Sequence, residues 1–190
     1  AAVGALYGLG QSVDVIRTGI GTFHPSITQN PGRMNLIDFV TFKVIIDYGH
    51  NVPAVRALGA VLPHISIGRK IVVAHGSGSR VDKAIRELGA ALADVYDYLI
   101  IADADPRGRE PGETPDLVVS GVLDQGFSRN NLEIISDPLL AIDRAFELVK
   151  PGDLIVIQVD EVKPMLDRVI KHFERIVDFV EKPELVVASV

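Results

Sequence analysis

Cysteine is absent from this 190-residue sequence. Its absence excludes disulfide bonds, thiolate metal sites and cysteine nucleophiles, and it is typical of a chain that works in the reducing cytoplasm. Long hydrophobic runs are absent too, since stretches such as Ile71–Ala74 and Leu154–Ile157 are only about 4–8 residues long, too short to cross a bilayer. No basic stretch followed by an apolar one, as in a signal peptide, stands near Ala1. We therefore expect a cytoplasmic chain with no membrane partner.

Positive charge is also scarce. The sequence has 19 Lys and Arg against 25 Asp and Glu, a formal net charge of −6. Because sequence-independent binding to nucleic acid needs a basic face, we expect no nucleic-acid partner, although local basic sites for a phosphate or carboxylate stay open. Apolar residues are plentiful at 47%. That content and this length predict a folded domain with a sizeable core rather than a disordered chain.

Residues 1–30 carry helical patterns but no strand. Ala1–Gly10 is rich in small residues, and Ser12 is a candidate N-cap for a second helix. The stretch from Phe23 to Arg33 holds two prolines and a glycine, which is typical of a linker. Because two short helices cannot form a core of their own, we expect residues 1–30 to be the end of a preceding domain together with a linker.

Residues 31–176 alternate between strand and helix patterns. The candidate strands are Leu36–Phe39, Lys43–Asp47, Lys70–Ala74, Tyr98–Ala102, Leu132–Ile135 and Leu154–Gln158. Continuous Val, Ile and Leu strands between amphipathic helices predict an α/β fold, a Rossmann-like, mostly parallel sheet with helices on both faces. The first two strands can pair as an antiparallel edge hairpin. Residues 177–190, with the apolar run Leu185–Val187, are expected to form a tail or an extra strand.

Polar residues at the carboxyl ends of parallel strands are the first candidates for a site, because ligands bind there in open α/β sheets. Asp47-Tyr48-Gly49-His50-Asn51 follows one strand and leads into a helix. A carboxylate, an imidazole and an amide beside a helix N-terminus suit the ribose and phosphates of a nucleotide. The alternative is that Asn51 only caps the helix and His50 only lies in a turn.

The segment His75-Gly-Ser-Gly-Ser-Arg80 follows the strand Lys70–Ala74. Glycines let backbone N–H groups approach an anion closely, and Arg80 adds a positive charge, so the segment can cradle an anion. It is neither a Walker A motif nor a dinucleotide-binding fingerprint. The alternative is an ordinary turn.

The segment Asp103–Glu113 follows the strand Tyr98–Ala102 and is densely charged. Arg107 and Arg109, separated by one glycine, can present guanidinium groups to a carboxylate or phosphate. Asp103 and Asp105 can take an ammonium or another cation. The alternative is a solvated loop whose charges neutralise one another.

Other chemistry finds little support in the sequence. No histidines and carboxylates stand at a zinc-binding spacing, and no G-x-S-x-G nucleophile motif occurs. Asp137-Pro138 is a helix-start signal, an N-cap followed by proline at the first helical position. Asp160 and Glu161 also open a helix, where acidic residues are expected from the helix dipole alone. We therefore expect neither a metal site nor a catalytic residue from this chain alone.

Three motifs in fixed order resemble the C-terminal domain of the Mur ligases. They are Asn30-Pro-Gly-Arg-Met34, Asp47-Tyr-Gly-His-Asn51 and Asp103-Ala-Asp-Pro-Arg-Gly-Arg109. The third is most similar to the corresponding loop in the cyanophycin synthetase branch of that superfamily. The resemblance assigns residues 1–30 to the end of the family's central ATPase domain and residues 31–176 to its C-terminal domain.

The resemblance implies an ATP-dependent ligase that makes amide bonds. In this family ATP phosphorylates a carboxylate, and the amine of an incoming amino acid attacks the acyl phosphate. The family holds ATP and Mg²⁺ mainly in its central domain, so this chain, which lacks the P-loop, is not expected to turn over alone. Its partners would be ATP, the upstream ATPase domain, and an amino acid for which arginine and aspartate are the candidates.

Position in the motifs implies a role for individual side chains. The residues expected to bind the nucleotide are Arg33, Asp47, His50 and Asn51. The residues expected to bind the amino acid are Arg80, Asp103, Asp105, Arg107 and Arg109. Two alternatives stay open: an α/β module that binds an anionic metabolite without chemistry, and a Mur ligase domain that acts on peptidoglycan precursors.

Overall fold

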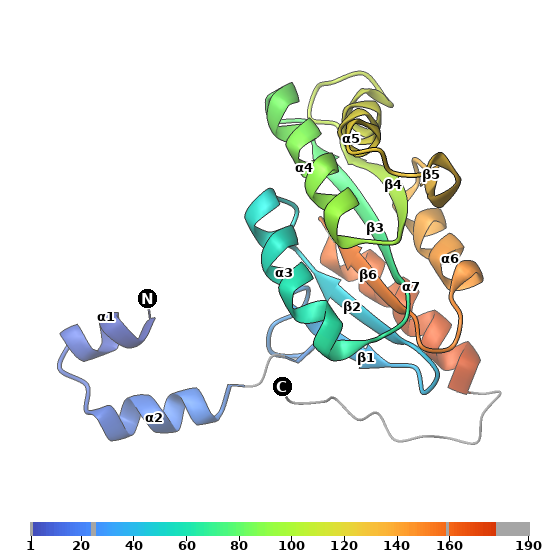
Figure 1. Ribbon diagram of the computed structural model, residues 1–190. Helices are drawn as coiled ribbons and strands as arrows, with labels where there is room; N and C mark the ends of the chain where they lie inside the picture. The colour runs from blue at the N-terminus through green and yellow to red at the C-terminus, as the bar shows by residue number, and fades with distance from the viewer. Residues whose placement is uncertain (1, 24–25, 159, 178–190) are drawn as a thin grey trace.

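The computed structural model describes residues 2–23, 26–158 and 160–177, which form a twisted sheet covered by helices on both faces and preceded by a helix pair (Figure 1). The strands are β1 Asn35–Asp38, β2 Lys43–Asp47, β3 Lys70–Ser77, β4 Tyr98–Asp105, β5 Leu132–Ile134 and β6 Leu154–Gln158. The α-helices are α1 Ala2–Gly8, α2 Val13–Gly21, α3 Val52–Ile65, α4 Asp82–Val95, α5 Glu113–Asp124, α6 Pro138–Leu148 and α7 Val162–Val177. A 3₁₀ turn, Arg129–Asn131, precedes β5.

The sheet has the strand order β1-β2-β6-β3-β4-β5. β1 pairs with β2 antiparallel and every other pairing is parallel, which confirms the mostly parallel sheet and its antiparallel edge hairpin. β6 lies in the middle, where Ile155 is opposite Val44 of β2 on one side and Ile71 of β3 on the other. β3 and β4 both run past their expected ends and carry polar side chains into the carboxyl edge of the sheet.

Alternate side chains of β6 enter two different core layers. Leu154 and Val156 belong to the cluster beneath α3, α4 and α5, whereas Ile155 and Ile157 belong to the cluster beneath α6 and α7. All four are 0% exposed. Full burial of such side chains stabilises the fold by roughly 1.5–3 kcal/mol each. The expectation of helices on both faces is therefore confirmed.

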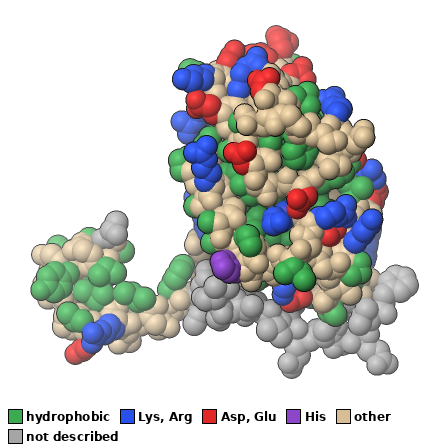
Figure 2. All heavy atoms as spheres, in the orientation of Figure 1, with side chains coloured by type: hydrophobic (Ala, Val, Ile, Leu, Met, Phe, Trp, Pro, Cys, Tyr) green, Lys and Arg blue, Asp and Glu red, His purple; other side chains and the backbone are tan. Residues whose placement is uncertain are grey.

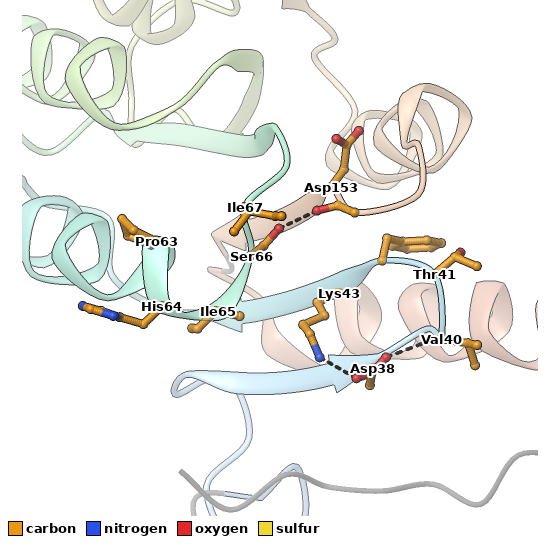
Figure 3. A pocket seen from close by; sticks show the side chains of 12 residues that line it. Asp38, Val40, Thr41, Lys43, Pro63, His64, Ile65, Ser66, Ile67 and Asp153 are labelled. Atoms are coloured by element: carbon orange, nitrogen blue, oxygen red, sulfur yellow. Dashed lines mark hydrogen bonds and ion pairs between the residues drawn. The ribbon is translucent and has the colours of Figure 1, made fainter.

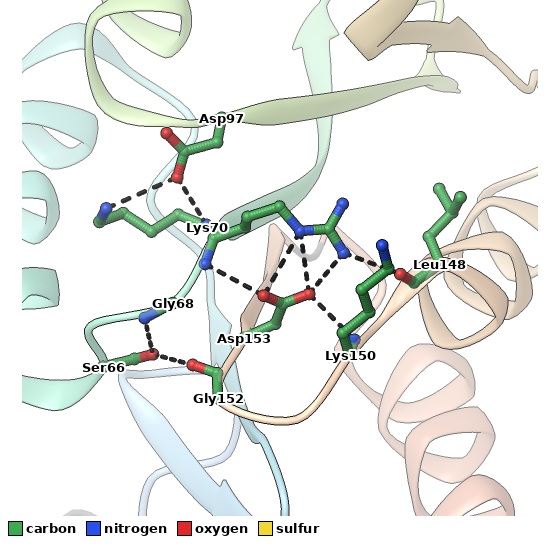
Figure 4. Close-up of polar contacts among 9 residues, drawn as sticks. Ser66, Gly68, Lys70, Asp97, Leu148, Lys150, Gly152 and Asp153 are labelled. Carbon is green, nitrogen blue, oxygen red and sulfur yellow. Dashed lines mark hydrogen bonds and ion pairs between the residues drawn. The ribbon is translucent and has the colours of Figure 1, made fainter.

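Asp153 ties the starts of β3 and β6 together at the amino edge of the sheet (Figure 4). Its carboxylate accepts hydrogen bonds from the backbone N of Arg69 at 3.0 Å, from Nη2 of Arg69 at 2.6 Å and from the backbone N of Lys150 at 2.9 Å. Asp153 is only 5% exposed. A buried carboxylate needs such partners, because an unpaired charge in the interior is costly.

A hollow of about 290 Å³ opens at the same edge, between the β1–β2 turn, the end of α3 and the loop before β6 (Figure 3). Lys43 and Asp38 form an ion pair at 2.5 Å along its wall. Val40 stands beside it with 64% of its surface exposed and a left-handed backbone, φ 69°. No motif singled out in the sequence falls on this hollow, which lies at the opposite edge from the segments expected to bind ligands.

The α1–α2 pair stands apart from the sheet (Figure 1). Ser12 caps α2 as expected, since its Oγ accepts from the backbone N of Val15 at 3.3 Å. Only Ile16 of the two helices is buried, and Figure 2 shows hydrophobic side chains gathered on the surface of the pair. That residues 1–30 end a preceding domain stays a prediction. Residues 178–190 lie outside the described residues, and so does the expected tail or extra strand.

Candidate functional site at the carboxyl edge

The three polar segments singled out from the sequence meet at the carboxyl edge of the sheet. Tyr48, after β2, donates its hydroxyl hydrogen to Asp160, after β6, at 3.4 Å. The ring of His50 stacks against that of His75 on β3, with centroids 5.9 Å apart. Ser77 on β3 donates to Asp105 on β4 at 2.7 Å. Strand order thus gathers residues that are far apart in the sequence.

Both carboxylate oxygens of Asp47 accept hydrogen bonds from backbone N–H groups. Oδ1 accepts from the N–H of Gly49 at 2.6 Å, and Oδ2 accepts from the N–H of Met34 at 2.8 Å. A Cβ at Gly49 would lie 2.5 Å from Oδ1 and 2.8 Å from Cβ of Ala54, so a larger residue here would make the Asp47 side chain shift. The carboxylate of Asp47 therefore fixes the turn that carries Arg33 against the end of β2.

Arg33 lies over the ring of Tyr48, with its guanidinium carbon 4.7 Å from the ring centroid. This is a cation–π contact, which weakly orients the guanidinium without neutralising its charge. The contact of Arg33 with a nucleotide, expected from its place in the motifs, stays a prediction.

His50 and Asn51 are held by local hydrogen bonds. Nδ1 of His50 lies 2.8 Å from the carbonyl oxygen of Tyr48. The other ring nitrogen, Nε2, takes no part in this hydrogen bond. Asn51 caps α3, since its side-chain oxygen accepts from the N–H of Ala54 at 3.0 Å. The capping role weighed for Asn51 is thus present, and its contact with a nucleotide stays a prediction.

His75 is the buried base of the site at 2% exposure. Burial lowers the pKa of His75 despite the nearby carboxylates of Asp160 and Asp105, so the ring is neutral at neutral pH. Its Nε2 has no hydrogen-bond partner among the described residues. The sequence places His75 in the segment after β3, whereas the structure places it inside the strand.

The glycine–serine segment packs directly on the Asp103–Arg109 loop. The N–H of Gly78 donates to the carbonyl of Asp105 at 2.8 Å, and a Cβ at Gly78 would lie 1.9 Å from the carbonyl oxygen of Pro106. Burial raises the pKa of Asp105, but hydrogen bonds from Ser77 and Arg107 outweigh burial and lower it below the ordinary value. Asp105 is therefore ionised and already occupied by two donors.

The two arginines of the loop have different surroundings. Arg107 donates through Nε to Asp105 at 2.6 Å and keeps 58% of its side chain exposed. Arg109 is 17% exposed and donates to the carbonyls of Gly78 at 3.0 Å and Arg80 at 2.8 Å. It also pairs with two carboxylates, those of Asp82 and Glu113. Arg107 is thus free to reach a ligand, while Arg109 joins the two loops.

Arg80 lines a hollow of about 440 Å³ between the starts of α3 and α4. His50, Asn51 and Ser77 line it as well, and Glu87 adds a carboxylate. The structure therefore brings Arg80 to the same side of the site as the residues expected to bind the nucleotide.

A second hollow, of about 290 Å³, lies between the starts of α6 and α7 and is strongly acidic. Its carboxylates come from Asp103, Asp137, Asp160 and Glu161. Asp103 accepts from the N–H of Gly112 at 2.8 Å, while its Oδ1 has no partner among the described residues. Sequence reasoning missed this hollow because Asp137 and Asp160 each have a local explanation at a helix start.

The described residues contain no grouping of three or more His, Asp or Glu side chains that could hold a metal ion. They also contain no helix that is both long and apolar enough to cross a bilayer.

Comparison with known proteins defines the class. Residues 32–158 match the family described as "Mur ligase, glutamate ligase domain". The chain belongs to this family.

The curated relatives include a cyanophycin synthetase from Synechocystis sp., which is 36% identical over 168 residues, or 88% of this chain and 19% of the relative. A UDP-N-acetylmuramyl-tripeptide synthetase from Borrelia garinii is 34% identical over 66% of this chain and 25% of the relative. The chain thus spans about a fifth of the length of its cyanophycin synthetase relatives.

Solved structures agree on the fold. The folylpolyglutamate synthase of Mycobacterium tuberculosis, complexed with ADP and AMPPCP, has a TM-score of 0.62 at 21% identity, covering 92% of this chain and 36% of that one. The MurF ligase of Thermotoga maritima in complex with ADP has a TM-score of 0.60 at 20% identity, covering 92% and 37%.

Proposed function

We propose that this chain is the closing, C-terminal domain of an ATP-dependent ligase that joins an amino acid to a carboxylate through an amide bond. The observation that carries the proposal is the shared carboxyl edge in a domain of the Mur ligase family. There Arg33 lies over Tyr48, and His50 stacks on His75 of β3. Ser77 of the same strand bonds to Asp105, at the start of the charged loop. ATP and Mg²⁺ would be held mainly by the upstream domain.

The reaction has two steps. The substrate carboxylate attacks the γ-phosphorus of ATP, so that an acyl phosphate forms and ADP leaves. The neutral amine of the amino acid then attacks the acyl carbon and the amide bond forms. Inorganic phosphate leaves with the electrons of the broken C–O bond and takes up the proton that the amine loses. This domain supplies binding and orientation for both steps.

On the nucleotide side, Arg33 would bind the phosphates or the ribose. Its guanidinium lies over Tyr48 at the carboxyl end of β2, and no carboxylate of the described residues forms an ion pair with it. His50 and Asn51 would lie near the nucleotide, beside the hollow that also contains Arg80. Asp47 would act by holding the Arg33 turn, since its two oxygens already accept backbone N–H groups.

On the amino-acid side, Arg107 would bind the α-carboxylate through its exposed guanidinium nitrogens. The acidic hollow would bind a cationic side chain of the amino acid. Oδ1 of Asp103, which has no hydrogen-bond donor among the described residues, would accept a hydrogen bond from it. Its charge favours arginine over aspartate, the other candidate. Arg109 would organise the loop; a direct contact of Arg109 with the amino acid stays a prediction.

The test is a steady-state assay of the full-length protein with arginine, lysine and aspartate as amino acids. Arginine should give the highest kcat/KM, and Glu161→Gln, which removes one charge from the acidic hollow, should raise the KM for arginine with little change in the KM for ATP. Glu174→Gln, at an exposed position of α7 outside both hollows, is the control. Absence of both amide formation and ATP turnover with every amino acid would contradict the proposal and favour a binding module.

The peptidoglycan-precursor alternative has one observation in its favour, the similarity to a UDP-N-acetylmuramyl-tripeptide synthetase. The acidic hollow could also accept a side-chain ammonium. The same assay separates the two, because that alternative requires a UDP-linked muramyl peptide as the carboxylate substrate.

A further inference from the structure

Asn35, the first residue of β1, makes all its described side-chain hydrogen bonds to the turn that precedes it. Its oxygen accepts from the N–H of Gly32 at 2.6 Å. Its nitrogen donates to the carbonyls of Asn30 at 3.1 Å and Arg33 at 3.4 Å. Asn35 is 1% exposed, so this buried amide has both its donor and its acceptor satisfied by the backbone of one turn.

The same turn is fastened to β2 from the other side. The N–H of Met34 donates to Asp47, and the N–H of Tyr48 donates to the carbonyl of Gly32 at 2.8 Å. Upstream, Ile27 packs against the core layer beneath α6 and α7. Although the composition of this stretch is typical of a linker, Ile27 packs on the sheet domain, and Gly32 and Met34 are hydrogen-bonded to it.

The backbone of the turn has a conformation that needs support from neighbouring side chains. Met34 has φ 49° and Gly32 has φ 74°. A residue with a side chain adopts this left-handed region only at a cost in free energy, and the conformation persists where neighbouring contacts over-determine it. Asn35 and Asp47 supply those contacts on either side of Arg33.

We infer that Asn35 is a positioning residue that sets the direction of the Arg33 guanidinium, and that the turn 30–35 moves with the sheet as a rigid arm. The inference rests on the proposed function, in which Arg33 meets the nucleotide. Asn35 does so without touching the nucleotide, because it lies buried beneath the turn.

A double-mutant cycle on the full-length protein tests the inference. Asn35→Ala should raise the KM for ATP about five- to tenfold, the effect of a lost orienting hydrogen bond, and leave the KM for the amino acid unchanged. Combined with Arg33→Ala, it should add nothing further, because a residue that acts only through Arg33 has no effect once Arg33 is gone. Asp38→Asn, at the other end of β1, is the matched control.

Amide hydrogen exchange gives a readout besides activity. In Asn35→Ala the N–H groups of Gly32 and Met34 should exchange faster, while those of β2 keep their protection. If Asn35→Ala does not fold, Asp47→Asn loosens the same turn from the other side and should show the same non-additivity with Arg33→Ala.

Each outcome decides a different point. If the two single effects multiply in the double variant, Asn35 acts independently of Arg33 and the positioning role is wrong. If Arg33→Ala raises the KM for ATP but Asn35→Ala does not, the inference fails while the proposed function stands. If Arg33→Ala itself leaves ATP kinetics unchanged, the nucleotide assignment fails and the inference fails with it.

Discussion

Asp105 lies between two donors, with Ser77 Oγ 2.7 Å from one oxygen and Arg107 Nε 2.6 Å from the other. Burial opposes ionisation of this carboxyl, and these two hydrogen bonds reverse the effect, so Asp105 stays charged. The consequence for Arg107 is geometric. Nε of the guanidinium is held by Asp105, while 58% of the side chain is exposed.

Replacing Arg107 by lysine should therefore impair binding of the amino acid. Lysine keeps the positive charge but loses the planar fork, and it cannot contact Asp105 and a carboxylate with the same geometry. We expect the KM for the amino acid to rise about tenfold and the KM for ATP to change less than twofold in the full-length protein. Arg129→Lys, in the 3₁₀ turn before β5, is the control, and equal constants for both variants would contradict the role of Arg107.

Replacing Asp153 by alanine should cost about 2–4 kcal/mol of unfolding free energy, measured by urea denaturation. The change leaves Arg69 and the backbone N–H of Lys150 without their acceptor at the point where β3 and β6 begin. Asp167→Ala removes an exposed partner of Lys163 and should cost less than about 1 kcal/mol. Similar losses of unfolding free energy for the two variants would show that the buried hydrogen bonds of Asp153 do not stabilise the fold more than an exposed ion pair does.

Replacing Val40 by glycine should stabilise the chain. A β-branched residue at φ 69° is strained, and the side chain is mostly exposed, so its removal sacrifices little burial. After the extra chain entropy of glycine is subtracted, we expect a gain of about 0.5–1 kcal/mol. Val81, equally exposed but with φ −69°, gives the contrast: Val81→Gly should bring no gain.

His75 should make stability fall in mild acid. Because burial lowers the pKa of His75, this side chain binds a proton less readily in the folded chain than in the unfolded one. Unfolding is therefore favoured as the pH drops below the ordinary histidine pKa near 6.5. The unfolding free energy should therefore decline between pH 7 and pH 5, and His75→Gln should flatten that slope. A wild-type slope in His75→Gln would exclude His75 as its cause.

Periodicity and helix-start signals were sufficient to predict every strand near its place, as well as the caps at Ser12 and Asp137. They did not predict that β3 and β4 continue to Ser77 and Asp105. The residues that extend these strands are polar, and their burial depends on a neighbour 28 positions away, Ser77 with Asp105. Local propensity carries no information about such a contact.

The candidate site was predictable where its members are close in sequence, as in Asp47–Asn51. The acidic hollow was not, because Asp103, Asp137 and Asp160 come from three separate strand–helix junctions. Asp137 caps α6 in the structure, as the sequence indicates. The sequence carries no sign that Asp137 also lines this hollow. The role of Asn35 was hidden for a similar reason, since an asparagine at a strand start carries no signal of its own.

The position of β6 has a consequence for synthesis of the protein. It is the last described strand to leave the ribosome, yet both of its neighbours, β2 and β3, need it as their common partner. Until residues 154–158 emerge, a nascent chain holds a β1–β2 hairpin and a β3–β4–β5 sheet with open edges between them. Such edges invite pairing with other chains. A release or truncation before Leu154 should therefore yield aggregates rather than a smaller folded domain.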